Sequence, residues 1–202
     1  MTELSAITTI NYRTTAGIAI AIAITAVISI ITLTLLYSGL PFFGPVNDLT
    51  NAVGGLLSAL LVWQFHTLLR ERAPNTAIFF SLAAWIGSAA IIINSLLVAF
   101  GRMHWMTGGM YTAIGYGLIG IWLFALHRQF GLGEFLPSGV LKLGVFAAVA
   151  MLFGLLAGPL LASGISFSEN PPLVSVAYVG AAAGWLLYPV WCWLVGRSIL
   201  AS

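Results

Sequence analysis

The sequence predicts an all-α integral membrane protein, and three observations carry this prediction. Of 202 residues, 60% are hydrophobic, and the mean hydropathy is +1.06. Only 6% are charged (7 basic and 5 acidic), against roughly 25% in a water-soluble domain. The apolar stretches are about 20 residues long, the length of helix that crosses a hydrocarbon core of roughly 30 Å. Together these features exclude a soluble domain, a disordered chain and a nucleic-acid-binding protein, since the few basic residues do not cluster.

Six apolar stretches divide the chain, and each is expected to cross the membrane as a helix. They cover roughly residues 15–37, 48–69, 77–100, 106–127, 140–162 and 174–196. Residues 19–24 alternate Ala and Ile, a period typical of a strand, but an open strand would leave its backbone groups unpaired in lipid. Because every connection is short, residues 1–202 are expected to form a single six-helix bundle.

The positions of the prolines support the division of the chain into six apolar stretches. Six of the eight lie in the connections: Pro41, Pro45, Pro74, Pro137, Pro171 and Pro172. The other two, Pro159 and Pro189, lie inside the fifth and sixth stretches. Each removes a backbone donor there and is expected to kink its helix.

The basic residues predict the orientation. If the N-terminus is cytoplasmic, six of the seven cations fall on the cytoplasmic side: Arg13, Arg70, Arg72, Arg128, Lys142 and Arg197. Only Arg102 falls outside, so the positive-inside rule places both termini in the cytoplasm. The first apolar stretch is too long for a cleavable signal, and no organellar targeting segment precedes it. The expected location is the inner (plasma) membrane of a prokaryote.

Three of the expected helices end with the same pattern, a pair of aromatic residues followed by an arginine. The three groups are Trp63, Phe65 and Arg70; Trp122, Phe124 and Arg128; and Trp191, Trp193 and Arg197. Aromatic rings and cations both favour the headgroup region of a bilayer. The groups are therefore expected to anchor the helix ends.

Small residues at a spacing of four predict where helices pack closely, because lipid provides no hydrophobic force between helices. The stripes are Ala150, Gly154, Gly158 and Ala162; Gly180 and Gly184; Asn51, Gly55 and Ala59 beside Gly54 and Ser58; and Gly109, Gly117 and Gly120. We expect a compact bundle. A homodimer face and a sliding transport interface are the alternatives.

Polar residues within the outer half of the bundle form the candidate site. They are Asp48, Asn51, Asn94, Arg102, His104 and Tyr111. Polar side chains are costly in a membrane, so their convergence between the second, third and fourth helices would form a ligand pocket open to the outside. Structural roles are the alternative: Asn47 or Asp48 caps the second helix, Asn51 bonds Asn94, and Arg102 pairs with Asp48 or a lipid phosphate.

The histidines and the single cysteine offer little for a cofactor. His66 and His127 end parallel helices at matching depth, as a bis-histidine haem would need, but both lie near the interface, where a histidine is readily solvated. His104 is on the other side, so no metal site is expected. Cys192 alone forms neither an intrachain disulfide nor a CxxC pair. We expect no cofactor.

No common catalytic motif occurs, which argues against an enzyme. The first expectation is a structural, regulatory or accessory membrane protein whose partners are the bilayer and other membrane subunits or a second copy. The second is a transporter or channel for a small neutral or amphiphilic solute, with the two inner prolines as hinges. The third is a membrane-embedded enzyme acting on a lipid or isoprenoid, with His104 or Asp48 as acid or base.

Overall fold

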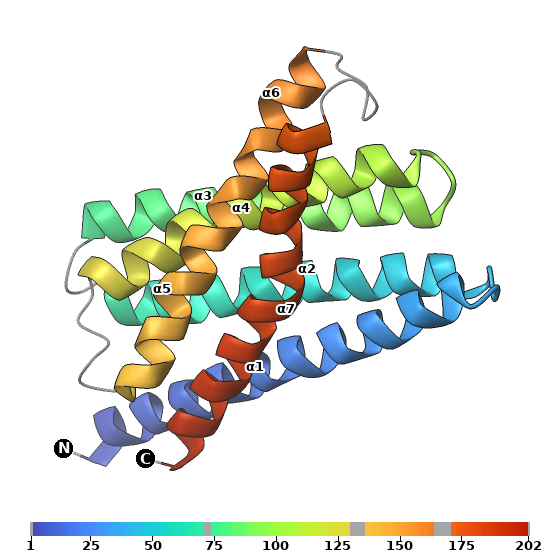
Figure 1. The fold of residues 1–202 in the computed structure, drawn as a ribbon. Coiled ribbons are helices and arrows are strands. Elements are labelled where there is room, and N and C mark those ends of the chain that lie inside the picture. The colour runs from blue at the N-terminus through green and yellow to red at the C-terminus, as the bar shows by residue number, and fades with distance from the viewer. Residues whose placement is uncertain (1, 71–73, 130–135, 164–170, 202) are drawn as a thin grey trace.

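The computed structural model describes residues 2–70, 74–129, 136–163 and 171–201, and every regular element in these ranges is a helix (Figure 1). The elements are α1 (Thr2–Tyr37), α2 (Phe43–Leu69), α3 (Pro74–Ala99), α4 (Trp105–Gln129), α5 (Ser138–Leu152), the 3-10 helix η2 (Phe153–Leu156), α6 (Ala157–Ala162) and α7 (Pro171–Ala201). The all-α prediction is confirmed. Each predicted stretch coincides with one helix, except that the fifth is divided among α5, η2 and α6.

Five helical runs among the described residues are long and apolar enough to cross a membrane, which identifies an integral membrane protein. They are Tyr12–Tyr37, Pro74–Ala99, Trp105–Arg128, Ser138–Ala162 and Pro172–Ala201. Helix α2 is not among them, since it carries five strongly polar side chains: Asn47, Asp48, Asn51, Gln64 and His66. A sixth crossing by α2 stays a prediction.

The helices extend beyond the apolar stretches that predict them. α1 begins at Thr2 and α2 at Phe43, because a helix continues through polar residues that hydropathy excludes. Asn47 and Asp48 consequently lie inside α2, and the capping prediction is wrong, since the N-cap of α2 has no side-chain hydrogen bond. Pro74 begins α3, a position where the missing N–H has no helical acceptor to lose.

Consecutive helices pack side by side from α1 to α5, and α7 closes the ring by packing on α5, α4 and α1. In Figure 1, α5 and α7 cross steeply over the group formed by α1 to α4. The N-terminal end of α1 and the C-terminal end of α7 lie at the same end of the molecule. There Gly196 of α7 lies against Ala16 and Ile20 of α1, and from this crossing the two helices diverge (Figure 1).

The closest packing joins η2 to α4 and α7. A Cβ atom at Gly180 would overlap the backbone of Gly154, and one at Gly154 would overlap the carbonyl of Ala113. Backbone atoms cannot move aside as a flexible side chain can. These two glycines therefore permit a three-helix contact of the kind that the small-residue stripes predict.

The other stripe members behave differently. Gly184 lies under the ring of Tyr116, and Gly117 and Gly120 face η2 and α5. In contrast, a Cβ at Gly158 would meet only the Ile114 side chain at 4.0 Å, and one at Gly109 would meet nothing within 4 Å. The predicted close contacts at Gly158 and Gly109 are therefore wrong.

The two inner prolines have unequal effects. Pro159 lacks the N–H that would bond the Leu155 carbonyl, and the chain leaves α-helical geometry just before it, in η2. Pro189 likewise leaves the Trp185 carbonyl without its helical donor, but α7 continues as one helix through it. The fifth stretch is broken at its proline, and the sixth is not.

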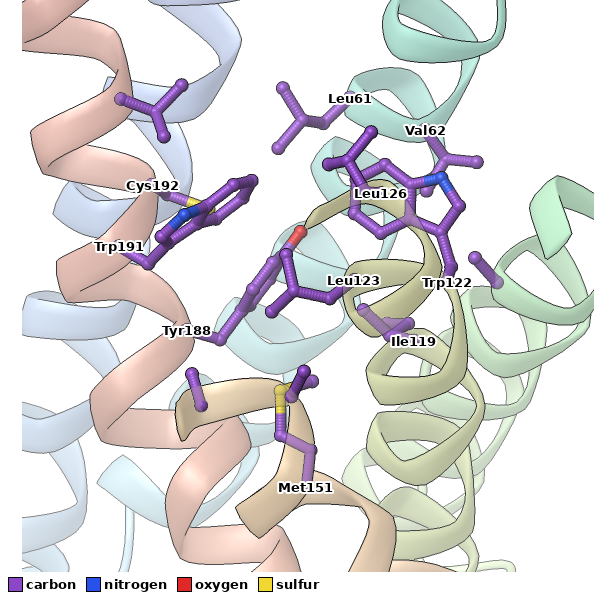
Figure 2. Close-up of a cluster of buried hydrophobic side chains, with 14 of the residues drawn as sticks. Leu61, Val62, Ile119, Trp122, Leu123, Leu126, Met151, Tyr188, Trp191 and Cys192 are labelled. Carbon is purple, nitrogen blue, oxygen red and sulfur yellow. The ribbon is translucent and has the colours of Figure 1, made fainter. Parts of the chain in front are cut away.

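One member of each predicted aromatic pair points into the bundle instead of the interface. Phe65, Trp122 and Trp191 are buried, and the Phe65 ring centroid lies 5.8 Å from that of Trp122 and 6.4 Å from that of Trp191. Figure 2 shows Trp122 and Trp191 among the apolar side chains of this core. Their partners Trp63, Phe124 and Trp193 are exposed or half-buried. The anchoring prediction therefore applies only to these outer members.

Two arginines at helix ends support the separation of the aromatic pairs into buried and outer members. The Arg128 guanidinium lies 5.6 Å from the centre of the Phe124 ring, and that of Arg197 lies 6.0 Å from the Trp193 ring. These distances allow cation–π contacts at the ends of α4 and α7. Arg72, another predicted anchor, lies outside the described residues.

Candidate functional site

A small polar pocket lies between α1, α2, α4 and α7, in the part of the bundle where α1 and α7 diverge. Its lining includes Ser29 of α1, Asn51 and Ser58 of α2, Tyr116 of α4, and Trp185, Tyr188 and Pro189 of α7. The space open to the centre of a water-sized molecule is about 20 Å³. That is room for about one ordered water.

Two asparagines and a serine join α1 to α2 on one wall of the pocket. The Ser29 hydroxyl oxygen is 2.8 Å from the Asn47 side-chain oxygen and 2.9 Å from that of Asn51, and all three residues are buried. A hydroxyl has one proton, so Ser29 donates to one asparagine at a time.

The opposite wall, on α7, carries two buried hydrogen-bonding groups without a partner. Tyr188 is only 1% exposed, and no described residue meets the distance and angle of a hydrogen bond to its hydroxyl, although Ser58 and Cys192 lie near it. The indole N–H of Trp185 is likewise without a well-formed hydrogen bond, although the Tyr116 hydroxyl lies near it. An unpaired buried polar group costs about 1–3 kcal/mol, so two of them in one pocket call for an explanation.

The pocket opens sideways, toward the surface of the bundle that lipid would cover. Ile30, at the α1 side of the pocket, is 40% exposed, and Trp185 on the α7 side is half-buried. The neighbouring exposed residues of α1, Val27, Ile28 and Ile31, are all apolar. The surface of α1 beside the pocket is therefore apolar.

None of the described residues that line this pocket has a charged side chain. The polar atoms that it presents come from hydroxyls, amides, an indole and a phenol. Its chemistry is therefore neutral hydrogen bonding.

Of the residues predicted for the site, Asn51 alone lines this pocket. Asn94 is buried on α3, where its side-chain nitrogen donates to the Ala90 carbonyl of its own helix at 2.6 Å. Tyr111 is 39% exposed. No hydrogen bond between described residues joins Asn51, Asn94 and Tyr111, so α1, and not α3, supplies the partner of Asn51.

The predicted outer lid is also dispersed. Arg102 and His104 lie exposed in the turn between α3 and α4, and Asp48 is half-buried in α2. Within the described part of the chain, no ion pair connects Asp48 with Arg102. His104 accepts a weak hydrogen bond from the backbone N–H of Met106 at 3.4 Å.

Sequence reasoning missed Ser29, Trp185 and Tyr188. A signal for Ser29 was present: a hairpin with its turn near residue 40 places residues 29 and 51 at equal depth, since 40 − 29 = 11 and 51 − 40 = 11. A signal for Trp185 was also present, because a proline four residues later frees its carbonyl. Tyr188 had no such signal beyond its place next to Pro189.

Both histidines considered for haem are engaged by protein groups. His127 donates from Nδ1 to the Leu123 carbonyl at 2.8 Å and accepts at Nε2 from the Trp191 indole N–H at 3.2 Å, which selects one neutral tautomer. The lone pair that iron would need is therefore in use. His66 has its Nδ1 3.1 Å from the Ser81 hydroxyl. Among the described residues, no three His, Cys, Asp or Glu side chains are grouped as a metal site.

Comparisons with protein-family models, with curated proteins and with solved structures found no match for this chain.

Proposed function

We propose that this protein binds a small neutral amphiphile in the pocket between α1, α2, α4 and α7. The observation that carries the proposal is that Tyr188, a residue of the pocket lining, has a buried hydroxyl without a well-formed hydrogen bond. A ligand that bonds this group would compensate the cost of burying it. The proposal belongs to the class of a transporter or binding protein for a neutral or amphiphilic solute.

The absence of charge in the lining favours a neutral ligand. A charged group moved from water into the bundle would meet no counter-charge among the pocket residues, and the cost of such a transfer is high. The sideways opening and its apolar rim favour an amphiphile that enters from the bilayer. The apolar part of the ligand would stay between α1 and α7, with its polar head at Asn51 and Tyr188.

Entry requires α1 and α7 to move apart, because the pocket holds only about one water in its present state. Pro189 lies in the lining and removes one backbone hydrogen bond from α7 at this level. Bending α7 there costs less than bending an uninterrupted helix. Pro189 is the proposed hinge.

We further propose that all six helices cross the inner membrane of a prokaryote with both termini in the cytoplasm. The bias of the basic residues supports this orientation, since six of seven fall on the side of the termini. The common end of α1 and α7 agrees with an even number of crossings. Tags fused to either terminus and tested for protease access in inverted vesicles would check it.

A pocket-filling variant tests the proposed binding. A Cβ at Gly54 would have an ordinary contact of 3.8 Å with Thr25, so Gly54→Leu places its added side chain in the pocket without moving backbone. Gly139→Leu is the matched control, because Gly139 is exposed and has nothing within 4 Å. Full-length protein is purified from membranes, and the bound lipids are quantified by mass spectrometry.

We expect an amphiphile in near-stoichiometric amount with the wild type and the control, and its loss from Gly54→Leu. The same amphiphile, added back, should raise the melting temperature of the wild type and of the control, but not that of Gly54→Leu. Equal lipid content in all three proteins would contradict the proposal. It would then favour the structural or accessory role expected first from the sequence.

A further inference from the structure

We infer that the polar head of the ligand is a neutral hydrogen-bond acceptor, of which a carbonyl oxygen is the chemical class that fits best. This inference rests on the proposed function, because it concerns the ligand of the same pocket. It follows from which hydrogen-bonding groups around the pocket still lack a partner.

The unpaired groups on α7 are donors. The Trp185 indole has an N–H and no lone pair to offer, so only an acceptor can pair it. The Tyr188 hydroxyl also has a proton to donate, and it is the more deeply buried of the two. The two donors belong to residues three apart on one helix, and both residues are part of the pocket lining. A carbonyl oxygen has two lone pairs and can accept from both.

The two hydroxyls on the α2 wall have already used their protons. The Ser58 hydroxyl donates to the Gly54 carbonyl at 2.8 Å, and the Thr50 hydroxyl donates to the Val46 carbonyl at 2.7 Å. A hydroxyl oxygen that has donated needs no second bond, whereas a buried donor without an acceptor is costly. The hydrogen-bonding groups of the pocket that lack a partner therefore need an acceptor.

One further acceptor is present but covered. Pro189 leaves the Trp185 carbonyl without its helical donor, and the proline ring occupies the place of that donor. The freed backbone carbonyl of α7 would therefore be closed to the proton of a ligand hydroxyl. A ketone, quinone or ester head has no such proton to place.

The test compares two probes with the same carbon skeleton, 2-tridecanone and 2-tridecanol, on the full-length protein in lipid nanodiscs. Saturable binding of each isotope-labelled probe is measured by scintillation proximity. We expect the ketone to bind about fivefold more tightly than the alcohol, the effect of about one net hydrogen bond.

The variants Tyr188→Phe and Trp185→Phe remove one donor each and keep an aromatic ring. Each should weaken ketone binding about fivefold and bring the ketone-to-alcohol ratio toward one. Tyr37→Phe and Trp105→Phe are the matched controls, since both residues are exposed and lie outside the pocket lining. The controls should leave both affinities unchanged.

The outcomes separate the inference from the proposed function. Saturable binding that Gly54→Leu abolishes, with equal affinity for ketone and alcohol, would overturn the carbonyl inference and leave the proposed pocket intact. A preference for the ketone that survives both Phe variants would overturn it as well. No saturable binding of either probe would overturn both.

Two membrane sources could supply a carbonyl head, an ester-linked glyceride or an alkylated quinone. Unlabelled dioleoylglycerol and decylbenzoquinone are therefore added as competitors of the labelled ketone. The competitor that displaces it at the lower mole fraction identifies the source. Displacement by both equally supports recognition of the carbonyl alone, and displacement by neither contradicts the inference.

Discussion

Helix α7 packs against its two sets of neighbours in opposite ways. Toward η2 and α4 it is closed, with Gly180 against the backbone of Gly154 and Gly184 under the ring of Tyr116. Toward α1 it is closed only at its C-terminal end, where Gly196 meets Ala16, and it is open from Pro189 upstream. The closed side has glycines where backbones touch, whereas the open side has unpaired polar groups.

The difference indicates that the two sides of α7 have different roles. The closed side fixes the position of α7, because backbone contacts leave no freedom to repack. The open side contributes little packing and leaves two donors unpaired, an arrangement that stability alone would not select. Substitutions on the closed side should therefore lower stability, and those on the open side should lower binding.

The largest effect is expected at the closest backbone contact. Gly180→Leu would force α7 away from Gly154, and we expect a loss of more than about 3 kcal/mol in the free energy of unfolding, or no folded protein at all. Gly139→Leu should change it by less than about 0.5 kcal/mol. Thermal unfolding in detergent, followed by size-exclusion chromatography, measures both. A Gly180→Leu protein as stable as the control would contradict the closed side.

The next effect is expected at the hydrogen bond between α4 and α7. His127→Leu leaves the Trp191 N–H buried without an acceptor, so we expect a loss of about 1–3 kcal/mol. Adding Trp191→Phe removes the orphaned donor and should recover part of the loss, which a double-mutant cycle would measure. His104→Leu is the control, because His104 is exposed. Full additivity of the two substitutions would show that the bond contributes nothing.

A smaller effect on stability is expected on the open side. Asn51→Leu removes one of two partners of Ser29, and a hydrogen bond between membrane helices contributes about 0.6 kcal/mol on average. The same variant should nevertheless lose ligand binding. Asn94→Leu is the control, since Asn94 bonds only its own helix among the described residues, and it should bind as the wild type does. Reversed results for the two asparagines would restore the site first predicted between α2, α3 and α4.

The smallest effect is expected for Asp48 of α2 and Arg102 of the turn between α3 and α4. No ion pair joins Asp48 to Arg102 in the part of the chain that the structure describes, so Asp48→Asn combined with Arg102→Gln should alter neither stability nor binding measurably. The melting temperature and ketone affinity of the double variant provide the check. A clear loss of melting temperature or of ketone affinity would assign these two residues a role that their positions in the structure do not indicate.

Hydropathy along the chain was sufficient to predict where the helices lie in the sequence. It did not predict which helices pack against each other. The six apolar stretches locate the helices, since length and composition decide whether a segment can cross a membrane. Depth along a helix also follows from the sequence, which is why Asn51 was found. The direction in which a side chain points does not follow, because it depends on which helix packs on which face. Asn51 therefore faces Ser29 of α1, although Asn94 and Tyr111 were expected beside it.

The spacing of glycines in the sequence also did not predict which helices pack closely. The closest approach of α3 and α4 is at Gly87 and Gly115, which belong to no predicted stripe, whereas Gly109 belongs to one and packs on nothing. A single glycine is enough where two backbones cross, so a repeat at a spacing of four is not required. The aromatic pairs show a related effect, since residues two apart on a helix point in different directions. Phe65 and Trp63 accordingly separate into core and surface.

The short 3-10 helix η2 changes the angular register of the fifth crossing. A 3-10 helix turns by roughly 120° per residue and an α-helix by roughly 100°, so four residues rotate α6 by about 80° relative to an unbroken helix. Gly154 and Gly158 are thus neighbours in the linear pattern but point along different azimuths. The glycine face at Gly154 is thereby locked to the α7 backbone, whereas α6 meets α7 through Ala157 and Leu160 instead of Gly158.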